Sequence, residues 1–311
     1  MVKTKLFNWI GGKKWLSKDL NEIYSNILSN KNIDTYVEPF AGGLGSFLYT
    51  LETLKNYKVK KFILNDVNTT IITIYKEIKN NPEKLFESYW KIEEEYKKTV
   101  PNSVLTLHKT KQKEEIKNLL INSRDFYEIK KKEFNCLKRT NILEAIPYFL
   151  FLSQHSFNGV YRENSKGDFN TPFNWEGGLL NREDKLSVFL EYNKIFNDID
   201  VEFYNENAFN FIEKFNNKEN VMFYLDPPYL NKDISENKYN KDHFGLKEQI
   251  ILLNYIKKMD CVIFSNHYLD IFIDFCKENN INYKEVLRSN LINSDPSKRN
   301  KKVQEILAYK Y

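Results

Sequence analysis

The sequence predicts an α/β protein whose parallel sheet is interrupted by a mainly helical insertion. Short apolar runs bounded by turn residues indicate buried strands near both ends of the chain, whereas apolar residues at helical spacing fill the middle. We therefore expect residues 1–75 plus 200–311 to form one α/β domain, with residues 80–199 as an inserted module. A chain of 311 residues can bury the core of one large domain or two.

The first elements alternate between helix and strand. A basic, glycine-broken segment, residues 7–14, leads into a predicted helix near 16–28. The predicted strand at 35–40 ends in a glycine-rich loop, 41–46, which precedes a helix from about Phe47. Glycines at a strand-to-helix turn let the backbone approach a ligand closely, although many such loops are only tight turns.

An acidic residue follows the next predicted strand. Residues 61–65 form that strand, which ends in Asp66 and leads into a helix near Asn68. An acid at the end of the second strand, about 20 residues beyond a glycine loop, is where nucleotide-binding α/β folds hold a ribose diol. The loop lacks the Gly-x-Gly-x-x-Gly spacing of dinucleotide sites. An adenosine-containing ligand without a pyrophosphate therefore fits better than NAD.

The middle of the chain predicts helices at 85–98 and 114–137, joined by a polar loop over 102–113. It ends in a polar segment, about residues 156–175, that is typical of a hairpin. The inserted module is therefore expected to be mainly helical with one β-hairpin.

Basic residues gather in this module. Residues 130–132, Lys138 and Arg139 form a local cluster, in which Lys131 is a candidate phosphate contact. A solvated helix face is the simpler interpretation for any one of these lysines. Arg162 is different, because an arginine at the tip of the hairpin, where we expect it, can pair with guanine O6 and N7 in the major groove. The net charge of +5 and the pI near 8.7 are consistent with a polyanion partner without being diagnostic.

Beyond the insertion, one predicted strand delivers a chemically unusual tetrapeptide. Strands are expected at 221–225, 261–264, 284–288 and 303–309. The first ends in Asp226-Pro227-Pro228-Tyr229, where the prolines fix φ and remove two backbone donors. A carboxylate acceptor, a free carbonyl and a ring face together suit a planar amino group such as the exocyclic amine of a base. Asp-Pro-Pro is also ordinary turn chemistry, so the tetrapeptide needs partners elsewhere.

Taken together, these segments resemble the Dam family of DNA adenine-N6 methyltransferases over most of the chain. The matching segments are residues 9–13, 37–46, 65–66, 157–162, 167–173, 226–229, 265–267 and 299–307. Their order is that of the α-group enzymes. The resemblance implies a Rossmann-like, S-adenosylmethionine-dependent methyltransferase domain, with residues 80–199 as an inserted target-recognition domain that carries the DNA-reading hairpin. It also implies methyl transfer to N6 of an adenine that is flipped out of double-stranded DNA.

The resemblance assigns roles residue by residue. The implied catalytic residues are Asp226, Pro227, Pro228 and Tyr229. The implied cofactor-binding residues are Trp9, Lys13, Phe40, Gly42, Asp66 and Asp226. The expected DNA-binding residues are Asn158, Arg162, Pro172 and Lys131. The charged segment 230–244 is expected to be a lid.

Three residues depart from the family pattern. Asn8 stands where a lysine commonly precedes the tryptophan, Tyr161 is bulkier than the usual residue before the reading arginine, and Asn207 stands where many relatives carry an acid. Because Arg162 and Pro172 are retained, a GATC-like target is expected.

Two other functions are alternatives for a chain with these motifs. One is methyl transfer to another planar amine or amide, such as an RNA adenine or a protein glutamine, for which an Asn-Pro-Pro-Tyr variant is used. Aspartate at position 226 and the DNA-reading hairpin argue against it. The other is a catalytically inactive DNA-binding regulator, which the intact tetrapeptide and glycine loop make a minor alternative.

The composition bears on the cellular compartment, on metal binding and on membrane insertion. Three cysteines (Cys136, Cys261 and Cys276) are widely spaced and odd in number, which indicates reduced thiols in a cytosol. With the resemblance, we expect a cytoplasmic protein, bacterial or phage-encoded, that acts on chromosomal DNA. The histidines show no ligand spacing with them, so no metal is expected. No signal peptide is recognised, and the longest apolar stretch, 146–152, is too short to span a bilayer. No obligatory protein partner is implied, although a cognate restriction nuclease is compatible with the sequence.

Overall fold

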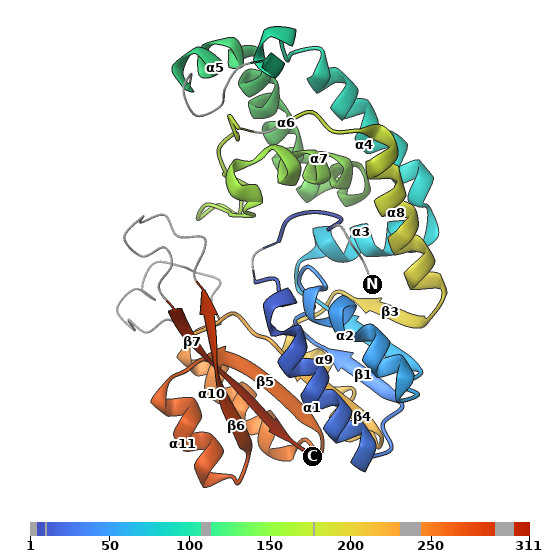
Figure 1. Ribbon diagram of the computed structural model, residues 1–311, viewed down its shortest axis with the longest axis vertical. Helices are drawn as coiled ribbons and strands as arrows, with labels where there is room; N and C mark the ends of the chain where they lie inside the picture. The colour runs from blue at the N-terminus through green and yellow to red at the C-terminus, as the bar shows by residue number, and fades with distance from the viewer. Residues whose placement is uncertain (1–4, 10, 107–112, 177, 231–243, 290–301) are drawn as a thin grey trace. The chain divides into compact units, whose positions relative to one another are not determined.

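Two compact units divide the chain (Figure 1). The computed structural model describes residues 5–9, 11–106, 113–176, 178–230, 244–289 and 302–311. The sheet unit holds Lys13–Val67 and Ile199–Tyr311, and the helical unit holds Met1–Gly12 and Asn68–Asp198. Residues 1–12 and 68–75, which the sequence assigned to the α/β domain, thus group with the helices. Most of the predicted lid at 230–244, and residues 299–301 of the closing segment, lie outside the described residues.

The sheet unit is built on seven strands in the order β3-β2-β1-β4-β5-β7-β6. The strands are β1 (Thr35–Glu38), β2 (Lys61–Asn65), β3 (Asp200–Tyr204), β4 (Val221–Leu225), β5 (Val262–His267), β6 (Asn282–Ser289) and β7 (Lys302–Lys310). Strands β1 to β5 pair in parallel, and β7 pairs antiparallel with both β5 and β6. This mostly parallel sheet confirms the predicted α/β, Rossmann-like fold.

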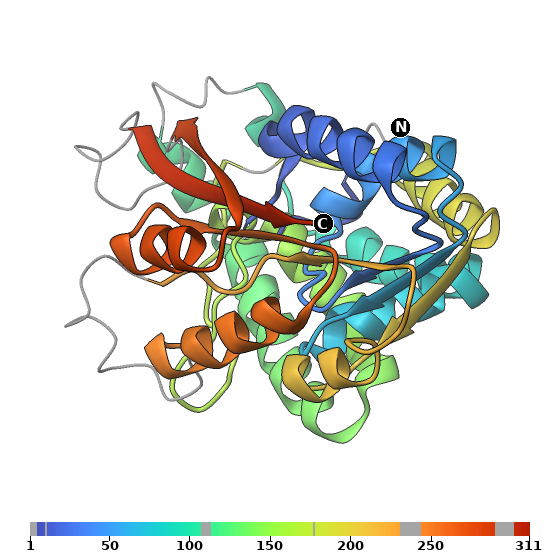
Figure 2. The same cartoon turned by 90° about the horizontal axis from the view of Figure 1, so that it is seen from below.

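Helices cover both faces of the sheet, so the central strands β1 and β4 are almost wholly buried, whereas β3 at one edge carries exposed polar residues. The helices of this unit are α1 (Ser17–Asn30), α2 (Gly45–Asn56), α9 (Ala208–Glu213), α10 (Leu246–Lys258) and α11 (Asp270–Glu278). Tyr36 and Phe62 point to the face of α1 and α2, where Phe47 lies 6.2 Å and 5.4 Å from their rings. The alternate residues, such as Val37 and Phe223, belong to a core shared with α9, α10 and α11. Figure 2 shows α1 and α10 on opposite sides of the sheet.

Buried aromatic residues and hydrogen bonds from α8 to the end of α3 hold the helical unit together. Its helices are α3 (Thr69–Asn80), α4 (Pro82–Lys97), α5 (Lys113–Leu119), α6 (Ile121–Thr140), α7 (Ile142–His155) and α8 (Arg182–Asn197), with short 3₁₀ turns at Asn102–Thr106 and Phe157–Gly159. Phe86, Tyr89 and Phe189 join α4 to α8 through ring contacts of 5.2 Å and 5.9 Å. Asn193 on α8 donates to the carbonyls of Ile78 (2.8 Å) and Lys79 (2.9 Å) at the end of α3.

Helix α7 was not predicted. It contains the apolar stretch 146–152, which is buried on all sides, so no helical period of polar residues marks it. No helix in the described part of the chain is long and apolar enough to cross a membrane.

Candidate functional site

Three loops that the sequence singled out leave the same edge of the sheet. The glycine loop follows β1, Asp66 follows β2, and the tetrapeptide from Asp226 follows β4. Strands β1 and β4 are neighbours, yet α2 after β1 and α10 after β4 cover opposite faces. Ligands of open α/β sheets bind outside the carboxyl ends of the strands at such a topological switch point. The topology therefore gathers these loops where a ligand site is expected.

The glycine loop is tied to the acid at the end of β2. The backbone N–H of Gly42 donates to Oδ2 of Asp66 at 2.9 Å, and Gly42 has a φ of 47°, which favours glycine. Asn65 also holds the loop, because its Nδ2 donates to the Pro39 carbonyl at 3.0 Å. Phe40 packs edge-on against Phe244, with ring centroids 5.3 Å apart. The loop thus has a defined backbone with a carboxylate and an aromatic ring beside it.

Asp226 is held by two side chains. Its Oδ2 lies 2.8 Å from the Lys13 ammonium, and its Oδ1 accepts from the Ser265 hydroxyl at 2.7 Å. The Lys13 side chain is only 5% exposed and that of Asp226 14%. In such a site charge-assisted hydrogen bonds are strong and directional. A carboxylate has about four lone-pair positions, so Asp226 keeps capacity to accept from a substrate amine.

Buried amides fix the backbone of the tetrapeptide. Gln249 on α10 donates to the Pro228 carbonyl at 2.8 Å, and Asn266 on β5 donates to the Gln249 amide oxygen at 3.1 Å. Asn266 Oδ1 in turn accepts from the Leu230 N–H at 3.2 Å. Both amide side chains are fully buried. Neither Gln249 nor helix α10, on which it lies, was predicted from the sequence.

Tyr229 is surrounded by polar and charged groups. Its hydroxyl donates to Glu305 on β7 at 2.9 Å, its ring lies 4.8 Å from the Lys13 ammonium, and His267 meets it edge-on at 5.0 Å. Burial, then the negative charges of Asp226 and Glu305, hold the pKa of Tyr229 well above its usual range. The hydroxyl therefore remains a donor. Neither Glu305 nor a function for His267 was predicted.

Glu38, the last residue of β1, is a buried carboxyl group close to this site. It accepts hydrogen bonds from the Tyr36 hydroxyl at 2.9 Å and from the Ser46 hydroxyl. Burial, opposed by those two hydrogen bonds, raises the pKa of Glu38 to about 8. The carboxyl group is therefore mainly protonated at neutral pH, a property that the sequence did not indicate.

Trp9 lies in the helical unit, whereas Lys13, Phe40, Gly42, Asp66 and Asp226 belong to the sheet unit. The Trp9 ring stacks on Tyr161 of the hairpin, with centroids 5.4 Å apart. Beside it, Asn8 packs so closely on Gly159 that a Cβ at Gly159 would lie 2.3 Å from the Asn8 side-chain nitrogen. The N-terminal segment is thus part of the surroundings of the hairpin.

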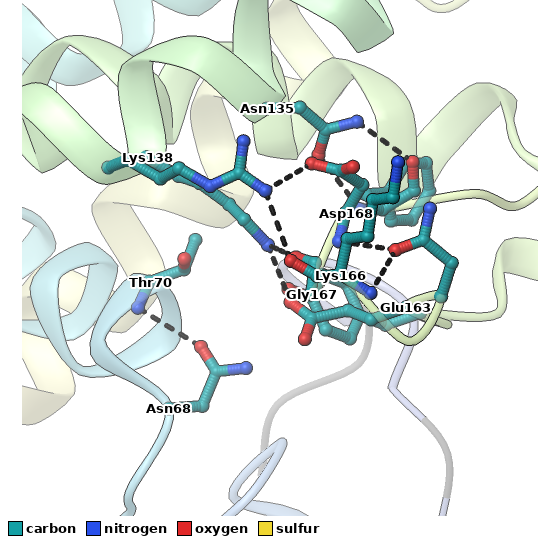
Figure 3. Close-up of polar contacts among 12 residues, drawn as sticks. Asn68, Thr70, Asn135, Lys138, Glu163, Lys166, Gly167 and Asp168 are labelled. Atoms are coloured by element: carbon teal, nitrogen blue, oxygen red, sulfur yellow. Dashed lines mark hydrogen bonds and ion pairs between the residues drawn. The ribbon is translucent and has the colours of Figure 1, made fainter. Parts of the chain in front are cut away.

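The segment predicted to be a hairpin contains two isolated antiparallel bridges and is bonded to α6 (Figure 3). Antiparallel bridges join Ser156 to Phe173 and Glu163 to Phe169. Lys138 pairs with Glu163 at 2.7 Å, and Arg139 pairs with Asp168 at 2.5 Å. Asn135 bonds both the carbonyl (3.0 Å) and the N–H (2.8 Å) of Phe169. Lys138 and Arg139, read in the sequence as members of a basic cluster, thus hold the hairpin in place.

The candidate DNA-binding residues differ in their surroundings. Asn158, Arg162 and Pro172 are exposed on the hairpin. Arg162 lies two residues before the turn that begins at Asn164 rather than at its tip, and its Nε donates to Asn170 at 3.0 Å. Lys131 is paired with Glu128 at 2.7 Å.

One exposed ring on the hairpin was missed. Phe157 is 51% exposed in the turn that opens the hairpin. An exposed aromatic side chain beside candidate base-reading residues can stack on a base. No cluster of three or more histidine, cysteine or acidic side chains that could hold a metal ion occurs among the residues that the structure describes.

Comparisons with known proteins indicate one family over nearly the whole chain. A family profile described as D12 class N6 adenine-specific DNA methyltransferase matches residues 9–290. The type II methyltransferase M.MjaIII of Methanocaldococcus jannaschii is 30% identical, over 97% of each chain. The DNA adenine methylase of Haemophilus influenzae is 28% identical, over 96% of this chain and 91% of the relative. The DNA adenine methylase of Escherichia coli is 25% identical, over 99% of this chain and 96% of the relative.

Proposed function

The chain belongs to the D12 class of N6 adenine-specific DNA methyltransferases, and from this premise we propose how it performs that reaction. The methyl donor is S-adenosylmethionine, the acceptor is N6 of an adenine flipped out of duplex DNA, and the target is a GATC-like site. The observation that carries the proposal is the position of Asp226, which is half-buried and paired with the buried Lys13 at the switch point of the sheet.

The cofactor residues fit an adenosine-containing ligand. Gly42 has no Cβ and a left-handed backbone, so the main chain can approach a ligand closely. Asp66, which already accepts from Gly42, supplies the acceptor for the ribose hydroxyls, and Phe40 provides an apolar wall. Bound S-adenosylmethionine supplies an electrophilic methyl group. The ring of Trp9 stacks on Tyr161 in the structure, and its contact with the cofactor stays a prediction.

The tetrapeptide orients the acceptor. Asp226 and the Pro227 carbonyl accept hydrogen bonds from the adenine amino group, which aims the nitrogen lone pair at the methyl group. Tyr229 stacks on the flipped base and returns about 1–3 kcal/mol of the cost of unstacking. The Asp226 carboxylate also stabilises positive charge that develops at N6. Transfer is a direct displacement without a covalent enzyme intermediate, so orientation supplies most of the acceleration.

The hairpin reads the duplex. Arg162 is exposed and already oriented by Asn170, so it can pair with guanine in the major groove. Asn158 and Pro172 lie on the same exposed hairpin. Lys131 is proposed as a phosphate contact, although its pairing with Glu128 lowers the charge it offers to DNA.

The test is methyl transfer from tritiated S-adenosylmethionine to duplex DNA, RNA and protein in parallel, followed by sequencing of methylated bases in DNA from a host that expresses the chain. We expect label in duplex DNA, N6-methyladenine at one short motif, and none with Asp226→Ala. A matched control is Glu202→Gln, which alters an exposed ion pair with Lys61. Label in RNA or protein alone, or in no acceptor, would overturn the proposal.

We also propose a cellular location and a partner for the protein. Cys136, Cys261 and Cys276 are free thiols, which suits the expected cytoplasmic location on DNA. A cognate restriction nuclease remains a prediction. Resistance of the methylated host DNA to a nuclease encoded beside this chain is the measurement that checks it.

A further inference from the structure

Glu305 is a buried acid that is followed on β7 by three apolar residues. Its side chain is 1% exposed, and the next residues, Ile306, Leu307 and Ala308, are buried hydrophobic residues. Burying a carboxylate is costly unless specific partners compensate for lost hydration. The described partners are the Tyr229 hydroxyl, 2.9 Å from Oε2, and the Arg288 guanidinium, 3.5 Å from Oε1. The acid is thus bonded to the aromatic residue of the tetrapeptide.

The sheet register places a second contact of the same ring beside Glu305. His267 on β5 and Glu305 on β7 are directly paired across the antiparallel ladder. Directly opposed residues project to the same face, so both side chains can meet one neighbour. His267 lies edge-on to the Tyr229 ring at 5.0 Å, and its Nδ1 is hydrogen-bonded with the Leu230 carbonyl at 2.8 Å.

Lys13 contacts the ring from another element. Its ammonium lies 4.8 Å from the ring centroid of Tyr229 while pairing with Asp226 at 2.8 Å. The ring therefore has a cation near its face, an imidazole at its edge and a carboxylate on its hydroxyl. Of these three contacts, the Glu305 hydrogen bond is the one at the hydroxyl end of the side chain, where it holds the phenol oxygen in place and so limits tilting of the ring.

We propose that Glu305 is a positioning residue for methyl transfer, which fixes through the Tyr229 hydroxyl the ring on which the target adenine stacks. This inference rests on the proposed function of Tyr229. A hydrogen bond to a carboxylate also increases the electron density of the phenol ring, and such a ring face attracts positive charge more strongly. Glu305 thereby supports the amino group as it gains charge, without contacting the substrate.

The experiment is a double-mutant cycle on the full-length protein. Single-turnover methylation rates are measured for wild type, Glu305→Leu, Tyr229→Phe and the double variant. We expect Glu305→Leu to lower the rate about 10- to 100-fold, as for loss of a hydrogen bond to a charged group, with cofactor and duplex affinities unchanged. In the Tyr229→Phe background the same substitution should cause little further loss. Glu305→Gln, which keeps an acceptor oxygen, should recover most of the rate.

A second readout does not depend on turnover. Fluorescence of 2-aminopurine at the target position reports stacking of the flipped base, and Glu305→Leu should shift it as Tyr229→Phe does. Glu285→Gln is the matched control, because Glu285 is an exposed acid on β6 that bonds Gln304. If Glu305→Leu does not fold, Tyr229→Phe removes the same hydrogen bond from the other side while it keeps the ring, and a wild-type rate and fluorescence in that variant would overturn the inference.

Two outcomes would overturn the inference: losses that multiply in the double variant, or a wild-type rate and fluorescence in Glu305→Leu. Failure of the proposed function is distinguishable, since wild-type protein would then transfer no methyl group to adenine in DNA.

Discussion

Replacing Asp226 by alanine should affect stability and catalysis through different contacts. The substitution removes the carboxylate that pairs at 2.8 Å with the Lys13 ammonium, itself 5% exposed. Breaking a buried ion pair by removing one partner costs about 3–5 kcal/mol. The same change removes the proposed acceptor for the adenine amino group, for which we expect a loss of about two to three orders of magnitude in methyl transfer, equivalent to about 3–4 kcal/mol.

The two effects are separated by a second substitution. In Lys13→Met/Asp226→Ala no charge is left buried, so part of the lost unfolding free energy should return, whereas the rate should not. Asp226→Asn retains an oxygen that can accept from Ser265 and should be less destabilised than Asp226→Ala. Guanidinium denaturation gives the unfolding free energy, and single-turnover transfer from tritiated S-adenosylmethionine gives the rate.

The control is an ion pair of the same chemistry at the surface. Glu202 and Lys61 are 2.6 Å apart, but their side chains are 38% and 39% exposed. Glu202→Gln should change the unfolding free energy by less than about 1 kcal/mol and leave the rate unaltered. Substantial turnover by folded Asp226→Ala would refute the assignment of Asp226 as the positioning acceptor. A wild-type unfolding free energy for Asp226→Ala would refute the stability argument.

Three further predictions concern other residues. Asp66→Ala should weaken S-adenosylmethionine binding by roughly 2–4 kcal/mol in calorimetry; an unchanged dissociation constant would limit Asp66 to holding the glycine loop. On duplexes with single-base substitutions at two salt concentrations, Arg162→Ala should cost about 1–3 kcal/mol at one base pair, whereas Lys131→Ala should weaken all duplexes alike; a uniform loss for Arg162→Ala would demote it to a phosphate contact. Because the folded pKa of Glu38 is raised from 4.5 to about 8, its stabilisation is complete below pH 4.5 and is lost as pH rises to 8. Unfolding free energies of wild type should therefore fall by several kcal/mol relative to Glu38→Gln over that window, and parallel pH curves would contradict this.

The sheet was predictable because its strands carry local signals. The apolar runs at 61–65 and 221–225 coincide with β2 and β4, and their flanking turn residues mark both ends. Strand β3 and helix α8 were missed, since the mixed polar residues of Asp200–Tyr204 and Arg182–Asn197 show no clear period. The acidic and aromatic residues at strand ends were found because the carboxyl edge of a parallel sheet is common to all its strands.

The residues that hold the tetrapeptide in place could not be found from local sequence signals. Gln249 and Glu305 act on the tetrapeptide from α10 and β7, which are distant in sequence and reach it only through tertiary packing. The interpretation of the basic cluster as a set of phosphate contacts was incomplete for the same reason. Lys138 and Arg139 look like DNA contacts until their partners in the hairpin, Glu163 and Asp168, are known.

The sheet unit has its exit and re-entry points side by side. Strand β2, which precedes the insertion, pairs with β3, which follows it, and Asn205 donates to the carbonyls of Asp66 and Val67. An insertion whose ends meet on one scaffold can be replaced with little cost to that scaffold. If the helical unit reads the DNA sequence, as proposed above, recombination between relatives can exchange that unit while the sheet unit is kept. Because Asn8 packs on Gly159, such an exchange must transfer the N-terminal segment together with the insertion, and chimaeras that swap only one of the two should recognise DNA poorly.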